Sequence, residues 1–385
     1  MDHAFSCEQD AIRATTRRFV HERVAPDYRT REVDGKIDRA LIREMGELGL
    51  IGADLPEELG APGLDSVTVG VIMEEMGRGD INVAYVQLLG SLMGSIIASH
   101  ARREVAEDIV PRICSGEIVV ALGLTEPGGG SDAAHLKTKA RRDSDDYILS
   151  GEKTSISMAE QADYVVVLAR TDETKPGAGG VSAFLTPLDS RGITRSSFDD
   201  VGSRAVGRGS IFFDDVRVPA RCLIGAEGKG FAQVMQGFDY SRALIGLQCL
   251  GSAAASLEET WKYITERTAF GNPLAKYQGV TEPLAEAETF LEAARLLCYK
   301  TLWLRDHGLP HTAEAAMCKW WAPKTSFQTI HRCLLTHGHG GYSTDLPHQQ
   351  RMRDVMGLQI GDGTEQIQKM IIAREKVGRV AVPYA

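Results

Sequence analysis

The sequence lacks the cysteine spacing of a metal site or a disulfide framework, since its seven cysteines are scattered and none forms a C-x-x-C pair. We therefore expect no zinc site and no disulfides, which suits a reducing compartment. Long apolar runs are also missing, and none approaches the about 18 residues of a membrane helix. The opening M-D-H-A-F-S-C-E-Q-D has neither the basic region nor the apolar core of a signal peptide. These absences lead us to expect a cytoplasmic protein with no membrane contact.

Blocks of like charge are absent as well. The 52 acidic and 43 basic residues stand in short mixed-sign groups, and the formal charge is −9. Such patterning lacks the basic footprint of a nucleic-acid-binding protein. What the sequence does have is length and apolar content: 385 residues, 43% of them hydrophobic, are enough for two or three domains with buried cores.

Hydrophobic patterning divides the chain into three parts. Residues 1–117 and 227–385 show helical spacing, whereas residues 118–226 hold β-branched runs with period-two alternation. The predicted fold class is α+β, mainly α: an N-terminal helical domain, a central antiparallel β domain and a C-terminal bundle of four-helix type. One helix is expected after an N-cap at Asp38, and others over 67–78, 83–100, 102–114, 231–264, 281–306, 313–335 and 364–377. Strands are expected over 118–124, 147–149, 164–169, 182–185 and 211–213.

Two glycine-rich segments and one helix end are candidate ligand sites. T-E-P-G-G-G-S-D at Thr125–Asp132 could offer backbone N–H groups to a phosphate, carbonyl or flavin edge, although it is neither a Walker A loop nor a Rossmann fingerprint. A plain hairpin turn is the alternative. H-G-H-G-G-Y-S at His337–Ser343 has no acidic or sulfur partner at metal spacing, so we expect a packing or loop role and no metal. Arg267 ends a long helix, where its side chain either binds an anion or is solvated.

A carboxylate stands between two glycines just before the last expected helix. Gly361 and Gly363 permit backbone angles that side chains forbid, and they let a ligand approach Asp362. Thr364 and Gln366 fall on the first helical turn, where unpaired N–H groups and the helix dipole favour a polar or anionic cofactor. An ordinary capped helix with Asp362 near its N-terminus is the alternative, which these residues alone do not exclude.

Taken together, the ordered motifs resemble the acyl-CoA dehydrogenase family of flavoproteins. They are L-T-E-P-G-G-G-S-D, F-F-D-D-V-R-V-P, F-D-Y-S-R, R-T-A-F-G, M-R-D and G-D-G-T-E-Q-I-Q, and they span nearly the whole chain. The resemblance implies the family's helix, β, helix fold, FAD as cofactor and an acyl-CoA thioester as substrate.

The resemblance also implies flavin contacts in the β domain. Leu124 and Thr125 would lie against the isoalloxazine, with Gly130 in the same loop and Ser131 also toward the pantetheine. Ser157 stands where the family has a flavin-contacting threonine, and Ser155 stands where it has a tryptophan.

The remaining implied cofactor contacts lie in the C-terminal part. Arg267, Phe270 and Gln278 resemble residues that hold the adenine dinucleotide half across a subunit boundary. Gly338 and Gly341 match part of the family's glycine pattern, but Leu335 replaces the glutamine that commonly precedes it. Thr364 and Gln366 complete the implied set.

The implied acyl-CoA contacts are Ser131, Phe238, Asp239, Ser241, Arg242, Gly361, Asp362 and Gly363. Most family members carry the catalytic base as a glutamate after a tyrosine, where this chain has Gly361 and Asp362. A minority place it in the F-D-x-x-R segment, but that position is Ser241. The resemblance therefore implies Asp362 as the base that removes the α-proton.

The short base leads to an expected substrate. An aspartate arm is about 1.5 Å shorter than a glutamate arm, and Gly361 and Ser155 both remove bulk near the flavin. Family members with an aspartate base include those acting on cyclohexane carboxyl-CoA. The stretch 81–103 has no acidic residue for the 1,4-dehydrogenation that some members perform, so we expect the cyclohex-1-ene thioester as product.

Other functions stay open. A short or branched-chain acyl-CoA dehydrogenase is the main alternative, and a nitroalkane-oxidase-like flavoenzyme shares the fold and an aspartate base but does not need the coenzyme A contacts. A catalytically silent flavoprotein is a third. The resemblance further implies electron-transferring flavoprotein as electron acceptor and a homotetramer built as a dimer of dimers.

Overall fold

The N-terminal third is helical. In the computed structural model, which describes residues 4–381, the N-cap of the first helix is Ser6, in a capping box with Gln9. Asp38 caps the third helix by accepting from the Ala40 N–H at 2.9 Å, as predicted. The helices are α1 (Cys7–Phe19), continued by a π-helical turn (Val20–Val24), α2 (Tyr28–Asp34), α3 (Arg39–Glu47), α4 (Ser66–Gly79), α5 (Ile81–His100) and α6 (Arg103–Cys114).

The central part forms one mainly antiparallel sheet. Its strands are β1 (Val120–Gly123), β2 (Lys139–Asp143), β3 (Asp146–Ile156), β4 (Tyr164–Arg170), β5 (Val181–Pro187), β6 (Ile193–Ser197), β7 (Gly209–Pro219) and β8 (Leu223–Ile224). The strand order is β6-β7-β3-β2-β4-β5-β8, and β1 pairs with β4 in parallel. All five expected strands are present, whereas β2, β6 and β8 were not predicted.

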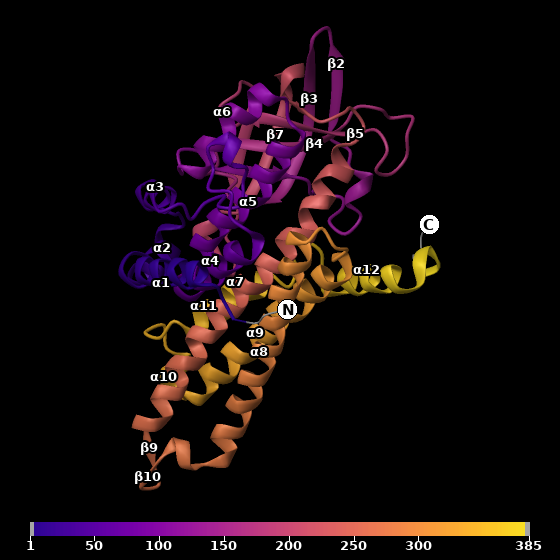
Figure 1. Ribbon diagram of the computed structural model, residues 1–385. Coiled ribbons are helices and arrows are strands. Elements are labelled where there is room, and N and C mark those ends of the chain that lie inside the picture. The colour runs from indigo at the N-terminus through magenta and orange to yellow at the C-terminus, as the bar shows by residue number, and fades with distance from the viewer. Residues whose placement is uncertain (1–3, 382–385) are drawn as a thin grey trace.

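The C-terminal part consists of long helices that lie side by side and a short hairpin at their far end (Figure 1). They are α7 (Gly230–Glu266), α8 (Gln278–Asp306) and α9 (Thr312–Thr336), followed by α10 (His339–Tyr342), α11 (His348–Gly357) and α12 (Glu365–Val377). The hairpin joins β9 (Thr268–Ala269) to β10 (Asn272–Pro273). The predicted α+β, mainly α fold is confirmed, while the outer limits of the terminal domains, residues 1 and 385, lie outside the described residues.

Helix α5 lies inside the molecule. Contrary to the expectation that no stretch approaches membrane length, it is long and apolar enough to span a membrane by composition alone, with a mean hydropathy of 1.6 over its most apolar window. However, 83% of that window is buried within the protein, as in the core helix of a folded domain. A Cβ added at Gly237 of α7 would come within 2.7 Å of the Leu92 side chain, so α5 packs closely against α7.

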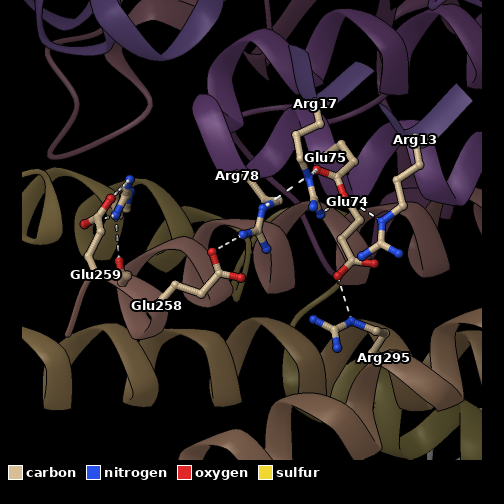
Figure 2. Close-up of polar contacts among 10 residues, drawn as sticks. Arg13, Arg17, Glu74, Glu75, Arg78, Glu258, Glu259 and Arg295 are labelled. Atoms are coloured by element: carbon tan, nitrogen blue, oxygen red, sulfur yellow. Dashed lines mark hydrogen bonds and ion pairs between the residues drawn. The ribbon is translucent and has the colours of Figure 1, made fainter. Parts of the chain in front are cut away.

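Ion pairs tie the N-terminal helices to the C-terminal ones (Figure 2). The Glu75 carboxylate on α4 accepts from Arg17 at 2.7 Å and from Arg13 at 3.1 Å, both on α1. Burial alone would raise the pKa of Glu75, but these arginines lower it overall. Neighbouring Glu74 accepts from Arg295 of α8 at 2.7 Å. A cavity of about 820 Å³ lies beside this network and contains none of the residues considered for the chemistry.

A buried carboxylate connects all three parts of the chain. Asp354 of α11 accepts from the Tyr28 hydroxyl at 2.7 Å, from Asn82 Nδ2 of α5 at 2.9 Å and from the Ser203 N–H at 2.5 Å. Burial raises the pKa of Asp354 to about 7 despite these donors. The cluster fixes α11, and with it the start of the turn at residues 361–363, relative to the other two domains.

Candidate active site

The segment Gly361–Asp362–Gly363 is a turn between α11 and α12. Asp362 has a φ of 55° and Gly363 a φ of 96°, so an L-residue occupies the left-handed region beside a glycine. Thr364 is the N-cap of α12, its side chain accepting from the Ile367 N–H. Within residues 4–381 the Asp362 carboxylate accepts no hydrogen bond. The capping role therefore belongs to Thr364, and the Asp362 carboxylate is left available for chemistry.

Lys319 of α9 holds this turn from inside. Its side chain is 1% exposed, and its ammonium donates to the Leu358 carbonyl at 2.8 Å and to the Gly363 carbonyl at 3.1 Å. Gln368 Nε2, also buried, donates to the Asp362 and Gly363 carbonyls at 3.0 and 3.2 Å. Sequence reasoning missed both residues, since a lysine on an amphipathic helix is usually solvated.

The electrostatics of the turn suit a general base. Burial raises the pKa of Asp362, and the positive charges of Lys319 and Arg242 offset part of that rise. Burial also lowers the pKa of Lys319 to about 8 although the Asp362 charge favours its protonated form. The carboxylate is thus a stronger base than one in water, while the nearby cations favour its ionised form.

The F-D-Y-S-R segment lies on α7. Arg242 is 7% exposed and donates to Asp239 at 2.8 Å, and Asp239 also accepts from Thr312 Oγ1 at 2.6 Å. In the described part of the chain the buried Arg242 Nε has no hydrogen-bond partner, which leaves a donor for a ligand oxygen. The Phe238 ring is buried below the Arg242 guanidinium, and the ring centre lies 6.0 Å from Arg242 Cζ. Ser241 is fully buried and donates to the Phe238 carbonyl, so it cannot serve as a base.

The T-E-P-G-G-G-S-D loop is fixed at its start and open at its glycines. Lys153 of β3 is fully buried and donates to Glu126 at 2.7 Å and to the Leu124 carbonyl at 3.1 Å. Burial lowers the pKa of Lys153 to about 8. A Cβ added at Gly128 or Gly130 would meet nothing within 4 Å, so the backbone there is accessible to a ligand. The turn closes on itself from Glu126 to Gly129, and Ser131 is exposed beyond it.

The end of β3 presents two hydroxyls. Ser155 has a φ of 58° and is exposed, and its Oγ accepts from Arg208 Nη1 at 3.4 Å. Ser157 is partly buried and, like Thr125, makes no side-chain hydrogen bond among the described residues. These unpaired hydroxyls and the open glycines fit the polar edge of a flavin, for which they can act as donors and acceptors.

The implied dinucleotide residues lie at the other end of the molecule from the sheet (Figure 1). Arg267 caps α7, Phe270 on the hairpin turn is 96% exposed with a φ of 48°, and exposed Gln278 opens α8. A single chain does not bring them to the Asp362 turn. The exposed ring of Phe270 could stack on a base, and the guanidinium of Arg267 could bind an anion, if another surface presented them.

The glycine segment at the end of α9 has a packing role on one side. His337 Nδ1 lies 2.9 Å from the Cys333 carbonyl, and its ring stacks on Tyr263. Gly341 is buried, whereas Gly338 is exposed next to Leu335, which is 62% exposed.

Gln366 is exposed on the first turn of α12. No cluster of three or more His, Cys, Asp or Glu in residues 4–381 could hold a metal ion.

Comparison with known sequences identifies this arrangement. Family models of acyl-CoA dehydrogenase match the N-terminal domain over residues 6–117, the middle domain over 121–216 and the C-terminal domain over 228–377. The chain belongs to the acyl-CoA dehydrogenase family. It is 33% identical over 378 residues to the probable acyl-CoA dehydrogenase YngJ of Bacillus subtilis (97% of this chain, 99% of the relative). It is 35% identical over 364 residues to the mitochondrial short-chain specific acyl-CoA dehydrogenase of Bos taurus (94% and 88%).

Solved acyl-CoA dehydrogenases share the whole fold. Butyryl-CoA dehydrogenase from Megasphaera elsdenii superposes with a TM-score of 0.95 at 32% identity, covering 98% of this chain and 100% of that one. A glutaryl-CoA dehydrogenase from Mycobacterium smegmatis in complex with FADH2 gives 0.92 at 27% identity, covering 97% and 95%. A structure described as electron transferring flavoprotein of Acidaminococcus fermentans gives 0.95 at 32% identity, covering 98% and 100%. As an acyl-CoA dehydrogenase, the protein is an FAD-dependent oxidoreductase.

Proposed function

We propose that this acyl-CoA dehydrogenase acts on an alicyclic thioester, converting cyclohexane carboxyl-CoA to cyclohex-1-ene carboxyl-CoA. The observation that carries the proposal is the room beside the base. A Cβ added at Gly361 would meet only the Gly357 carbonyl oxygen, at 3.8 Å, and the Gly361 backbone is not in the left-handed region. A side chain would therefore be tolerated there, and we infer that its absence leaves room for a ring beside Asp362.

The reaction removes two hydrogens from adjacent carbons. Asp362 takes the α-proton, the Cα–Cβ double bond forms, and the β-hydrogen leaves with its electron pair; bound FAD supplies the hydride acceptor. Donors to the thioester oxygen are needed as negative charge develops on it, and we assign one of them to the Asp362 backbone N–H. The unpartnered Nε of Arg242 supports our assignment of this residue to an oxygen of the substrate.

A short-chain acyl-CoA dehydrogenase is the second candidate, favoured by the 35% identity to the bovine short-chain specific enzyme. A smaller acyl group would also fit the widened space. A nitroalkane-oxidase-like reaction is a third candidate, but the buried Arg242 of F-D-Y-S-R and its pairing with the partly buried Asp239 argue for coenzyme A chemistry.

We further propose electron-transferring flavoprotein as the electron acceptor, a homotetramer as the working assembly and the cytoplasm as its location. The structural likeness to a chain described with an electron transferring flavoprotein supports the first. Phe270, at a position implied to meet the dinucleotide, and Leu335, which replaces the family's glutamine, are both exposed, which supports an assembly in which a second subunit covers them.

Anaerobic titration of the FAD-loaded protein tests the proposal. Cyclohexane carboxyl-CoA, butyryl-CoA, isobutyryl-CoA and nitroethane are each added while the flavin absorbance is recorded. Fast bleaching by the ring thioester is the expected result. Faster bleaching by butyryl-CoA or isobutyryl-CoA would establish the second candidate, bleaching by nitroethane the third, and no bleaching by any would overturn a dehydrogenase role for these substrates.

A further inference from the structure

Lys153 of β3 is a fully buried lysine at the start of the glycine-rich loop. Its exposed fraction is 0%, and its ammonium has two acceptors, Glu126 Oε1 at 2.7 Å and the Leu124 carbonyl oxygen at 3.1 Å. An ammonium withdrawn from water needs such partners. Glu126 alone balances the charge, and the second bond fixes the orientation of a main-chain peptide group.

The bond to the Leu124 carbonyl determines where the next N–H points. No peptide bond among residues 4–381 is cis, so the Leu124 carbonyl and the Thr125 N–H point in opposite directions. Because the carbonyl is directed inward at Lys153, the Thr125 N–H is directed away from this buried ammonium. The Thr125 carbonyl is held by β3 as well, through the Thr154 N–H at 2.9 Å. Strand β3 thus fixes the carbonyls on both sides of the Thr125 N–H.

Thr125 offers two unused hydrogen-bonding groups. Neither its N–H nor its hydroxyl has a hydrogen-bond partner among residues 4–381. The residue is partly exposed, whereas Lys153 and Leu124 are buried, so these groups belong to the open side of the loop. A main-chain N–H can only donate. It therefore suits an acceptor atom, such as a carbonyl oxygen or a ring nitrogen of the flavin that this FAD-dependent enzyme binds.

The same N–H favours one redox state of the cofactor. Hydride transfer adds one unit of negative charge to the bound flavin, and a hydrogen bond strengthens when its acceptor becomes more negative. A donor that is already oriented needs no reorganisation at that moment. The Lys153 ammonium also polarises the Leu124–Thr125 peptide group, because it draws electrons toward the carbonyl oxygen and makes the N–H a stronger donor.

We propose that Lys153 is a positioning residue for the cofactor: it aims the Thr125 N–H at an acceptor atom of the flavin and thereby favours reduction of bound FAD. Glu126 supports this role by balancing the Lys153 charge and by accepting from the Lys137 and Thr138 N–H groups at 2.6 and 2.8 Å. The inference concerns the cofactor and not the acyl group, so it is independent of whether the substrate is a ring or a straight chain.

Two substitutions in the ion pair separate positioning from stability. Lys153→Met removes the bond to the Leu124 carbonyl, whereas Glu126→Gln breaks the ion pair and leaves that bond in place. Both variants should have a lower Tm than the parent, because each loses a buried ionic contact. Only Lys153→Met should lower the midpoint potential of the bound flavin.

Anaerobic dithionite titration with a reference dye measures the potential. At pH 7, below the pKa of about 8 to which burial lowers Lys153, the side chain is an ammonium. In Lys153→Met the ratio of reduced to oxidised flavin at a fixed potential should fall about tenfold, which is about 30 mV for two electrons. In Glu126→Gln the potential should stay at or above the parental value, because the ammonium remains.

Two further variants complete the comparison. Combining Lys153→Met with Glu126→Gln leaves no unpaired buried charge, so it replaces Lys153→Met if that protein does not fold, and its potential should fall by the same amount. Lys139→Met, on neighbouring β2, removes a 59% exposed lysine that pairs with Glu173 at 2.9 Å and should leave the potential unchanged. Equal shifts in Lys153→Met and Glu126→Gln, or a parental potential without Lys153, would overturn the inference.

A measurement on the unmodified FAD-loaded protein needs no variant. Amide hydrogen–deuterium exchange at Thr125 should be slow, although no group in the described part of the chain accepts from its N–H, because the flavin does. Reduction with dithionite should slow the exchange further. Rapid exchange of this amide in both redox states would contradict the proposed bond to the cofactor.

Discussion

Asp362 is held in place through the backbone of its turn while its carboxylate accepts no hydrogen bond in the described part of the chain. Lys319 and Gln368 bind the carbonyls of the turn, and the left-handed φ of 55° is kept by these contacts. A carboxylate presented in this way can reach a substrate carbon without first breaking a bond to the protein.

Asp362→Asn should bind FAD normally and lose substrate-driven flavin reduction by about 10²- to 10⁴-fold, because the amide keeps the shape and cannot accept the proton. Stopped-flow absorbance under anaerobic conditions measures the rate. Asp362→Glu, which keeps the base and lengthens the arm, should reduce the rate on the ring thioester. Reduction by Asp362→Asn near the parental rate would place the base elsewhere.

Lys319→Met should move the acid limb of the kcat/KM profile to higher pH. Burial raises the pKa of Asp362 and the Lys319 charge opposes that rise, so removing the charge lets the pKa rise further. The base is then protonated over a wider acidic range. Lys324→Met on the same helix is the control, since its side chain is 40% exposed and pairs with Glu365. An unmoved limb in Lys319→Met would show that the lysine only supports the turn mechanically.

Among the elements, the contact between α1 and α4 depends on one buried carboxylate. The Glu75 side chain is 4% exposed and is shared by two half-exposed arginines of α1. Glu75→Gln should lower the free energy of unfolding by about 1–3 kcal/mol, less than for a fully buried pair because the arginines remain partly solvated. Glu258→Gln, whose side chain is 66% exposed and pairs with Arg78, should cost less than about 1 kcal/mol.

The Glu75 effect should depend on pH in a defined direction. The arginines lower the pKa of Glu75 below its ordinary 4.5, so its stabilising contribution is complete above that pH and is lost as the pH falls further. Denaturant unfolding of parent and Glu75→Gln should therefore differ at pH 7 and converge in acid. A difference that stays constant down to the lowest pH at which both proteins fold would contradict the ionic origin of the effect.

Sequence periodicity locates the long elements well and the short polar ones poorly. The helix expected over 281–306 is α8 at Gln278–Asp306, because apolar spacing persists over many turns. Strand β2, K-A-R-R-D, buries only Ala140 fully, so it offers no alternation to detect. Within the site, the G-D-G turn is visible from its glycines. Lys319 is not visible, because its role arises from burial and from distant partners that local spacing does not encode.

At the scale of the whole molecule, the loops proposed to face the flavin and the residues proposed to bind the dinucleotide lie at opposite ends of one chain. Arg267→Ala should reduce flavin content and shift the assembly toward smaller species together, because the same arginine is proposed to bind the dinucleotide at a subunit boundary. Flavin absorbance and gel filtration measure the two quantities. Lys276→Ala, which removes an exposed lysine bonded to Asn272 of the same hairpin, should change neither. Full flavin content and an unchanged assembly in Arg267→Ala would make this arginine a solvated helix-end residue.

The central claim is that the space beside a short base selects a ring substrate, and kcat/KM on two substrates in two proteins tests it most directly. The parent should prefer cyclohexane carboxyl-CoA to butyryl-CoA. Gly361→Tyr, which the open backbone at Gly361 accommodates, should lose about ten- to a hundredfold on the ring, corresponding to a clash of about 1–3 kcal/mol, and much less on butyryl-CoA. A parent that prefers butyryl-CoA, or equal losses on both substrates in Gly361→Tyr, would contradict the claim.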